Sequence, residues 1–382
     1  MPLPGTRVSG YVAALPQARS GGAVYGEGMP RTGEIRWGIM GTAGIARKQF
    51  LPAMREAGGV AAVVAGRDLA RAREYAARQD IGRAVHGYQA LIDDPEVDAI
   101  YLPLPNGLHA EWTIKALRAG RPVLCEKPLC GTLAETRQVL AVAQETGTLL
   151  WEAFVFPFQA QMGQLRGILA DGAIGELREI QANFHFPLTN PDNIRLRHDL
   201  AGGALNDVGC YPVRLASELI TAPHDSAWAV SIQGGDGVDV ETQGSLGFPG
   251  GKRLLLSCGF RRADDTFGRL LGTRGQINIT APYHPRAADT FQVCAAGKPP
   301  LSYPAAGLEQ PFTAAIRHIQ AVLRGAEEPR SLALDTSLRT AQALHDLHES
   351  AAAQLPPAGP APAAAAPAGT AQASAGPAVP HG

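Results

Sequence analysis

The sequence lacks the features by which a membrane protein, a disulfide-stabilised protein or a nucleic-acid-binding protein is recognised. No run of about 18 or more apolar residues occurs, which excludes a membrane-spanning helix on length. The five cysteines are odd in number, widely spaced and without a CxxC pair, so we expect a reduced, cytoplasmic protein without a metal site. With 34 Lys and Arg against 35 Asp and Glu, the chain has no excess of positive charge for a nucleic acid or an anionic membrane. Small-molecule chemistry is the remaining expectation.

The composition along the chain divides the 382 residues into four parts. Residues 1–33 are rich in Gly, Pro and Ser and lack the apolar core of a signal peptide, so we expect a disordered leader. Residues 351–382 are almost entirely Ala, Pro and Gly; without large side chains to bury, they are expected to form a disordered tail. The hydrophobic fraction of 45% is enough for two domains, which we predict at 34–152 and 153–350.

Strand and helix patterns alternate in the first of these domains but not in the second. First-domain strands are expected at 35–40, 60–65, 99–102, 122–125 and 149–151, with helices at 70–79, 109–119 and 133–146. Strict alternation predicts βαβ units and a parallel, doubly wound α/β sheet, a Rossmann domain. Second-domain strands follow one another at 177–184, 227–233, 238–247, 252–260, 269–272 and 276–280, with helices over one face at 160–170, 211–220, 309–323 and 337–349. This pattern predicts an α+β domain with a large, open-faced, mainly antiparallel sheet.

A run of small residues follows the first predicted strand directly: Gly41, Thr42, Ala43, Gly44, Ile45 and Ala46. It is a variant of the dinucleotide fingerprint, in which small residues permit a tight turn, a close approach of the backbone to a pyrophosphate and close packing of helix on strand. Its position after the first strand favours a dinucleotide-binding loop over an ordinary strand-turn-helix junction.

The second predicted strand is followed by Arg67, 21 residues after Ala46, where an NAD enzyme usually carries an acidic residue for the ribose 2′-hydroxyl. A guanidinium there can pair with a 2′-phosphate, so NADP is favoured over NAD. NAD stays open, because Asp68 could still bind a ribose hydroxyl and Arg67 could be a solvated loop residue.

Two further motifs each follow a strand of the predicted parallel sheet. The first is the stretch PLPNGLH, with the candidate residues Pro103, Leu104, Pro105, Asn106 and His109. Its prolines shape a loop against a flat ligand, and Asn106 or His109 can cap the following helix. The second delivers Glu126 and Lys127 at the carboxyl end of its strand, where ligands bind in open α/β sheets. Both motifs are candidate parts of a cofactor site.

Together with Glu152-Ala153-Phe154 and with GGALNDVGCY at 202–211, these motifs make the chain similar to the glucose-fructose oxidoreductase, inositol dehydrogenase and rhizopine catabolism (Gfo/Idh/MocA) family. The resemblance covers about 35–350. It implies a Rossmann domain followed by an open-faced sheet domain that carries the substrate site and often the oligomer interface. We expect a homodimer or homotetramer through the open sheet face, because an uncovered flat sheet exposes a large patch that association would bury. The resemblance also implies that the small-residue loop and the two motifs after the strands contact an NADP or NAD cofactor.

The resemblance implies catalytic residues as well. Lys127 is similar to the family's EKP lysine, beside the nicotinamide and the reacting carbon, and Asp207 and Tyr211 resemble the Asp-x-x-x-Tyr pair of the sugar and dihydrodiol dehydrogenase branch. If the segment is helical, a spacing of four puts this pair on one face. The chain departs from the family at EAFVFP (152–157), which lacks an arginine and a tyrosine hydroxyl that relatives often carry, so a more apolar pocket is expected there. Asn206 is polar where relatives are usually apolar.

The expected activity is hydride transfer between the cofactor and a carbinol or carbonyl of a sugar, polyol or cyclic diol, with Tyr211 exchanging the substrate proton. At ~4 Å and an effective dielectric of about 20, an ammonium stabilises a tyrosinate by about 4 kcal/mol, roughly three pKa units, so Lys127 is expected to bring the Tyr211 pKa into a working range. Asp207 would hold a substrate hydroxyl or orient Lys127. The alternatives are a tightly held cofactor used transiently in elimination or glycoside hydrolysis, and a non-catalytic nicotinamide sensor.

Overall fold

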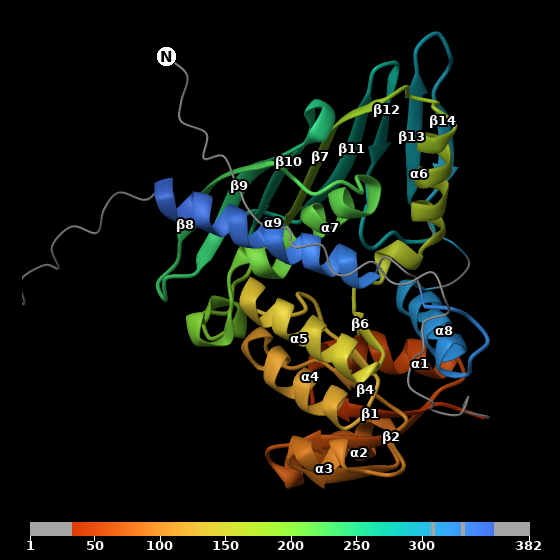
Figure 1. The fold of residues 1–382 in the computed structure, drawn as a ribbon, viewed down its shortest axis with the longest axis vertical. Helices are drawn as coiled ribbons and strands as arrows, with labels where there is room; N and C mark the ends of the chain where they lie inside the picture. Colours follow the sequence, from red (N-terminus) through yellow and green to blue (C-terminus); the bar gives the residue numbers. More distant parts are fainter. Residues whose placement is uncertain (1–32, 306, 308–309, 330–332, 355–382) are drawn as a thin grey trace, which may run out of the picture.

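The computed structural model describes residues 33–305, 307, 310–329 and 333–354, and these form two domains built on two separate sheets (Figure 1). The expected leader, apart from Gly33, and the expected tail beyond Gln354 lie outside the described residues. Among the helices of this described part, none is both long and apolar enough to cross a membrane. The two predicted fold classes, a Rossmann domain and a mainly antiparallel sheet domain, are both confirmed.

The first domain is a parallel sheet of six strands in the order β3-β2-β1-β4-β5-β6. Its strands are β1 (Arg36–Met40), β2 (Val60–Gly66), β3 (Arg83–His86), β4 (Ala99–Leu102), β5 (Val123–Cys125) and β6 (Leu150–Glu152). The sequence pattern does not predict β3, because this edge strand has no buried apolar run. The strand order reverses between β1 and β4, and ligands of doubly wound sheets bind beside that point at the carboxyl ends.

Of the five α-helices in the described part of the first domain, two begin at a residue whose side chain caps the backbone. The five are α1 (Leu51–Glu56), α2 (Leu69–Gln79), α3 (Tyr88–Ile92), α4 (His109–Arg118) and α5 (Leu133–Thr146). Asp68 Oδ1 accepts hydrogen bonds from two backbone N–H groups at the start of α2, so Asp68 is the N-cap of that helix. Helix α5 begins with a capping box of Thr132 and Glu135 and ends at Gly147, which has a positive φ.

The second domain is an eight-stranded sheet in the order β14-β13-β12-β11-β7-β10-β9-β8. Its strands are β7 (Leu177–His185), β8 (Ser226–Gln233), β9 (Asp239–Phe248), β10 (Lys252–Gly259), β11 (Asp265–Gly272), β12 (Gly275–Ile279), β13 (Thr290–Ala295) and β14 (Leu301–Pro304). Neighbouring strands are antiparallel except β7 and β10, which are parallel. Strands β13 and β14 are absent from the sequence-based expectation; both are short, and β14 is largely exposed at the sheet edge.

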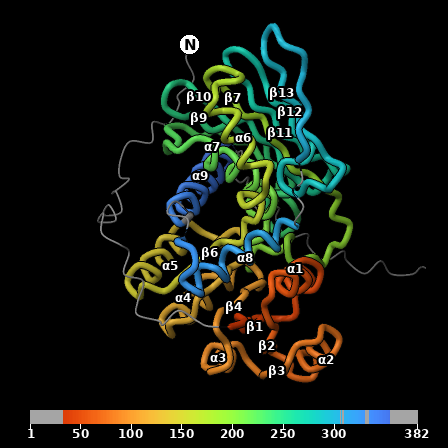
Figure 2. Tube along the Cα trace, turned by 90° about the vertical axis from the view of Figure 1, so that its right-hand side faces the viewer, coloured from red at the N-terminus to blue at the C-terminus, as the bar shows by residue number. Residues whose placement is uncertain are grey.

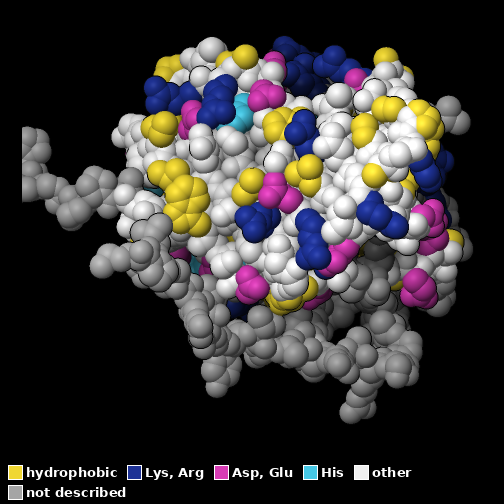
Figure 3. Space-filling view, turned by 90° about the horizontal axis from the view of Figure 1, so that it is seen from above, with side chains coloured by type: hydrophobic (Ala, Val, Ile, Leu, Met, Phe, Trp, Pro, Cys, Tyr) yellow, Lys and Arg dark blue, Asp and Glu magenta, His cyan; other side chains and the backbone are white. Residues whose placement is uncertain are grey.

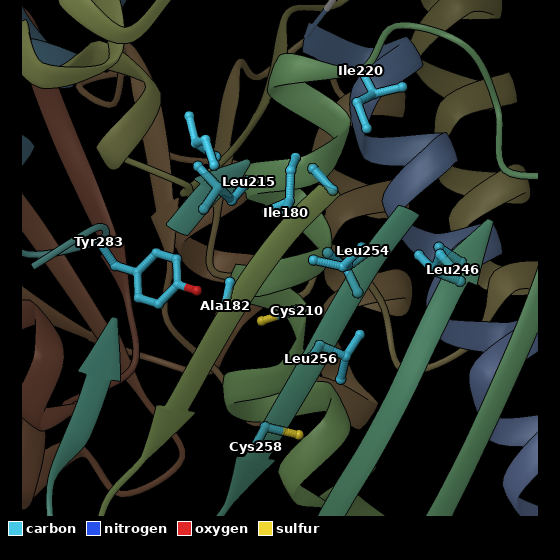
Figure 4. Close-up of a cluster of buried hydrophobic side chains, with 14 of the residues drawn as sticks. Ile180, Ala182, Cys210, Leu215, Ile220, Leu246, Leu254, Leu256, Cys258 and Tyr283 are labelled. Carbon is cyan, nitrogen blue, oxygen red and sulfur yellow. The ribbon is translucent and has the colours of Figure 1, made fainter. Parts of the chain in front are cut away.

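One face of the large sheet is covered by α6 (Ala160–Ala170), α7 (Cys210–Leu219) and α9 (Ala333–Gln354), as Figure 1 shows. In Figure 4, Ile180, Leu246 and Leu254 of the strands share one buried cluster with Cys210 and Leu215 of α7. These side chains alternate along each strand with side chains on the other face, so the strand pattern places the core on the helix-covered side.

The other face of the large sheet carries exposed apolar side chains. Trp228, Val230 and Ile232 of β8 are 50%, 43% and 48% exposed, while Ala229 between them is buried on the helix side. Strand register places Leu255 of β10 on the same exposed face as Trp228. Seen from above, Lys and Arg side chains are interspersed with Asp and Glu (Figure 3). An apolar sheet face of this kind is a candidate contact surface.

Two C-terminal helices lie differently from the expectation. Helix α8 (Pro311–Leu323) does not cover the large sheet but packs against α1 (Figures 1 and 2), with Phe312 and Ile316 in the same buried cluster as Met54. Helix α9 runs to Gln354, past the predicted domain end at 350, because Ala351 is buried in the sheet-domain core. Since α9 also contacts α5 and β6, the C-terminal segment ties the two domains together.

Candidate active site

A cavity of about 1150 Å³ lies between the two domains, where the loops after β1, β4 and β5 meet the second domain. It exceeds the range of about 300–1000 Å³ typical of single small-ligand sites. Most candidate residues line it: Ala43, Gly44, Ile45, Pro103, Leu104, Pro105, Asn106, Glu126, Lys127, Asp207 and Tyr211. The remaining candidates do not line it: Gly41, Thr42, Ala46, Arg67 and His109. The fold therefore brings residues of four distant motifs to one place with room for a dinucleotide and a second ligand.

The loop after β1 keeps its backbone open to the cavity. Gly41 has a φ of +102°, a conformation that favours glycine, and a Cβ there would lie 3.1 Å from Leu104 Cδ2. Ala43 and Gly44 line the cavity, and a Cβ at Gly44 would meet no described atom within 4 Å. Ala46 is instead fully buried in the core. The small residues thus serve the tight turn, the open main chain and the helix packing that a dinucleotide loop needs.

His109 and Asn106 do not cap α4. His109 is fully buried, and its Nδ1 and Nε2 atoms lie 2.9 Å from Pro128 O and 2.8 Å from Leu104 O. Burial lowers the pKa of His109, although these carbonyl contacts act to raise it. Asn106 Nδ2 donates to Ala201 O at 3.0 Å. Both capping predictions are therefore wrong: the His109 ring holds two cavity loops together from behind, and Asn106 ties the loop after β4 to the second domain.

Lys127, Asp207 and Arg195 form an ion-paired group on the cavity wall. Lys127 Nζ donates to Asp207 O at 2.6 Å and to its Oδ1 at 3.2 Å, and Arg195 Nε donates to Asp207 Oδ2 at 2.6 Å. Burial acts to raise the pKa of Asp207, but the two cations outweigh it and the pKa is lowered. Burial likewise acts to lower the pKa of Lys127, but Asp207 and other acidic neighbours outweigh it and the pKa is raised. Both groups are therefore charged at neutral pH.

Tyr211 stands in an aromatic wall beside this group. Lys127 Nζ lies 4.9 Å from its ring centre, and the ring centres of Phe154, Phe184 and Tyr283 lie between 5.1 and 5.5 Å away. The Tyr211 hydroxyl makes no hydrogen bond within the part of the chain that is described. Burial raises the pKa of this phenol and outweighs the lowering by Lys127. The expected shift of the Tyr211 pKa into a working range is therefore wrong: the ammonium is paired with Asp207, and the phenol stays protonated.

Glu126, next to Lys127, is held by a neighbouring strand. The Tyr101 hydroxyl donates to Glu126 Oε1 at 2.7 Å, and the Tyr101 ring stacks on Phe50 with ring centres 3.8 Å apart. Burial raises the pKa of Glu126, opposed by Tyr101 and Lys127. The carboxyl ends of β4 and β5 are thus fixed to each other at the cavity.

The junction between the domains is mostly apolar, as its sequence predicts. Ala153 and Val155 line the cavity there. Glu152 is the charged exception and joins two elements: Leu129 N donates to its Oε1 at 2.8 Å, and Arg214 Nη1 of α7 donates to its Oε2 at 3.2 Å. Glu152 therefore connects the loop after β5 with the helix that carries the catalytic tyrosine candidate.

Two polar residues of the cavity, Arg195 and His284, carry no sequence signal. Arg195 comes from the loop after β7 and His284 from the loop after β12, and neither follows a strand of the parallel sheet. Asn206, whose polarity the motif leaves unexplained, lies 3.1 Å from His348 Nε2 of α9 through its Oδ1 atom. Within the described ranges, no group of three or more His, Cys, Asp or Glu side chains is placed to hold a metal.

Gly202 lets the Arg195 loop sit against the turn that carries Asp207. A Cβ at Gly202 would lie 2.4 Å from Arg195 O, a backbone atom that cannot rotate away. We expect Gly202→Ala to lower the free energy of unfolding by about 1–3 kcal/mol and, by misplacing the loop, to lower turnover about tenfold or more. Thermal unfolding and steady-state kinetics measure both. Gly163→Ala is the control, because its Cβ would meet nothing within 4 Å; equal effects of the two changes would contradict the steric explanation.

The fold and the site together define the class of protein. The sequence model of the GFO_IDH_MocA oxidoreductase family, with an NAD-binding Rossmann fold, matches residues 35–154. The model of the GFO/IDH/MocA C-terminal domain matches residues 162–278. The chain belongs to this family.

Relatives within the family include enzymes named for sugars. A dTDP-3,4-didehydro-2,6-dideoxy-alpha-D-glucose 3-reductase of Streptomyces violaceoruber is 40% identical over 260 residues, covering 66% of this chain and 75% of that protein. A D-xylose 1-dehydrogenase (NADP(+)) 2 of Haloferax volcanii is 33% identical over 328 residues, covering 84% and 99%. A 3-ketoreductase from Actinomadura kijaniata, crystallised with NADP and TDP-benzene, has a similar structure: the TM-score is 0.77 with 33% identity, covering 83% of this chain and 98% of that chain.

Proposed function

We propose that this chain is an NADP-dependent reductase that delivers a hydride to a carbonyl carbon of a sugar or related hydroxylated ring, and that catalyses the reverse oxidation of the carbinol. The observation that carries the proposal is that the dinucleotide loop lines the same cavity as Lys127, Asp207 and Tyr211. The named relatives, a sugar 3-reductase and an NADP-dependent xylose dehydrogenase, support the same class of reaction.

The first domain fits a nicotinamide dinucleotide. Ala43 and Gly44 expose main chain along the cavity, with open space where a Cβ of Gly44 would stand. Asn106, Glu126 and Lys127 line the cavity farther along and would hold the nicotinamide end. When bound, the cofactor supplies the hydride in reduction and accepts it in oxidation.

Tyr211 is the proposed proton donor in the reductive direction. A carbonyl oxygen gains negative charge as its carbon is reduced, and a neighbouring acid neutralises that charge. Because burial raises the pKa of Tyr211, the phenol is protonated and ready to donate. The ammonium of Lys127 would stabilise the developing negative charge, and Asp207 would fix the position of that ammonium.

Arg67 is proposed to favour NADP by pairing with the 2′-phosphate. It is exposed after β2, and its guanidinium makes no hydrogen bond or ion pair with the residues described. We expect Arg67→Gln to raise the dissociation constant of NADPH about tenfold or more, with a much smaller change for NADH, because only NADPH carries the phosphate. Fluorescence titration measures both constants. Arg78→Gln, at the far end of α2, is the control; a similar loss for both cofactors would rule out phosphate selection by Arg67.

The proposal as a whole is tested with the purified protein. NADPH and NADH are titrated by fluorescence, and oxidation of NADPH or reduction of NADP is followed against aldoses, inositols, cyclic diols and the corresponding ketones. Turnover with release of the altered cofactor supports the reductase. Cofactor binding with no net redox turnover on any compound would contradict it and favour transient cofactor use or sensing.

The exposed sheet face is proposed to be the contact surface of a homodimer or homotetramer. Trp228, Val230 and Ile232 line up on β8, and burial of such a face by a second copy would remove their apolar surface from water. We expect the wild type to sediment as a dimer or tetramer, and Trp228→Glu to sediment as a smaller species, because it puts a charge into that contact. Sedimentation equilibrium measures the mass; a monomeric wild type would contradict the proposal.

A further inference from the structure

His284 is a polar residue of the cavity that the proposed reaction does not use. It lines the cavity from the loop after β12, and its ring centre lies 5.4 Å from that of Tyr211 and 6.2 Å from that of Phe184. Neither ring nitrogen makes a hydrogen bond or ion pair with any residue in the described ranges. The ring is therefore an unused polar group beside the proposed proton donor.

The charge state of His284 restricts the groups it can bind. The His284 side chain is exposed at the cavity. Partial desolvation of its ring by the surrounding protein, with the positive charge of Lys127, lowers the pKa of His284 to about 4. The imidazole is therefore neutral at pH 7, with one N–H donor and one acceptor nitrogen. A hydroxyl group, which can also donate and accept, is its complementary partner.

The groups around His284 on the cavity wall are an aromatic ring and positively charged side chains, so His284 is the uncharged polar group among them. The ring of Phe184 is in contact with the His284 ring, and Arg286 follows on the same loop. The two carboxylate oxygens of Asp207 are already engaged by Lys127 and Arg195. A substrate hydroxyl that reaches this side of the cavity would find a free partner in His284, and an apolar ring carbon would leave the imidazole without one.

We propose that His284 binds a substrate hydroxyl group next to the reacting carbonyl and thereby selects α-hydroxy ketones over unsubstituted ones. The contact between the His284 and Tyr211 rings places the bound hydroxyl close to the oxygen that Tyr211 protonates. The inference rests on the proposed function, because it takes the reacting carbon to lie beside Tyr211.

The test compares two ketones that differ by one hydroxyl, 2-hydroxycyclohexanone and cyclohexanone, as substrates with NADPH. We expect wild-type kcat/KM to be about three- to tenfold higher for the hydroxylated ketone, the value of one hydrogen bond to an uncharged group. His284→Phe keeps an aromatic ring without the nitrogens and should bring the ratio close to one, and His284→Asn should restore part of it. His345→Phe, exposed on α9 and outside the cavity, should keep the wild-type ratio.

A binding measurement separates this inference from the proposed function. The change in fluorescence of bound NADPH reports binding of trans-cyclohexane-1,2-diol and of cyclohexanol, and the wild-type preference for the diol should disappear in His284→Phe. A wild type without preference for the hydroxylated compounds, or a His284→Phe variant that keeps the preference, would overturn the inference. A wild type that reduces no ketone but binds the diol through His284 would overturn the proposed function alone.

Discussion

Replacement of Tyr211 by Phe is expected to leave NADPH binding unchanged and to lower turnover about 100-fold or more. The change removes the proton that the reduced carbonyl oxygen needs, while the ring keeps its contacts with Phe154 and Phe184. Because the hydroxyl makes no hydrogen bond with the residues described, the free energy of unfolding should change by less than about 0.5 kcal/mol. Fluorescence titration, steady-state kinetics and thermal unfolding measure the three quantities.

Tyr283→Phe is the matched control for this experiment. The Tyr283 ring lies against Tyr211, but Tyr283 is 1% exposed and its buried hydroxyl has no partner in the described part of the chain. Removal of that hydroxyl should stabilise the protein by about 1 kcal/mol or more and leave turnover nearly unchanged. If Tyr211→Phe kept wild-type turnover, or if the control lost as much, Tyr211 would not be the proton donor.

The first domain could be predicted because its local signals agree with its tertiary structure. Strand β2 is a continuous apolar run that is buried in a parallel sheet, and α5 carries its own capping box. The sequence does not reveal β3, β13 and β14. These short segments become strands because each pairs with a neighbouring strand, and their apolar content alone does not predict them. The apolar stripe of α8 predicts a helix but not the surface that it covers, since either domain could bury it.

A residue of the candidate site could be predicted from sequence where its position after a strand of the parallel sheet is enough to place it at the ligand-binding edge. Lys127 follows a strand of a parallel sheet, and any ligand at that sheet edge is near it. Asp207 and Tyr211 came from a family resemblance, and the structure places both beside Lys127. The pKa of Tyr211 could not be predicted, because its direction depends on burial and on the partner that Lys127 takes, which only the tertiary structure decides. Arg195 was missed because only the tertiary structure brings the loop after β7 to the cavity.

Lys127→Met is expected to lower turnover about 100- to 1000-fold, because it removes the charge that would stabilise the developing oxyanion. It should also lower the free energy of unfolding, since Asp207 loses a buried partner. The loss should stay below about 3 kcal/mol, the lower bound for breaking a buried pair and leaving an unpaired charge, because Arg195 still pairs with Asp207. Lys115→Met is the control: its ion pair with Glu111 is exposed, so stability should change by less than about 1 kcal/mol and turnover should not change.

The stability difference between Lys127→Met and the wild type should depend on pH in a direction that the ion pair dictates. The pKa of Asp207 is lowered, so its contribution is present above the ordinary pKa of about 4 and is lost as the pH falls below it. The pKa of Lys127 is raised, so its contribution is present below the ordinary value of about 10.4 and is lost as the pH rises through the higher folded value. Urea unfolding of both proteins across this range should show the largest difference between about pH 4 and pH 10. A difference that does not vary with pH would mean that Lys127 stabilises the protein through the packing of its alkyl chain, and the oxyanion role would then rest on the kinetic loss alone.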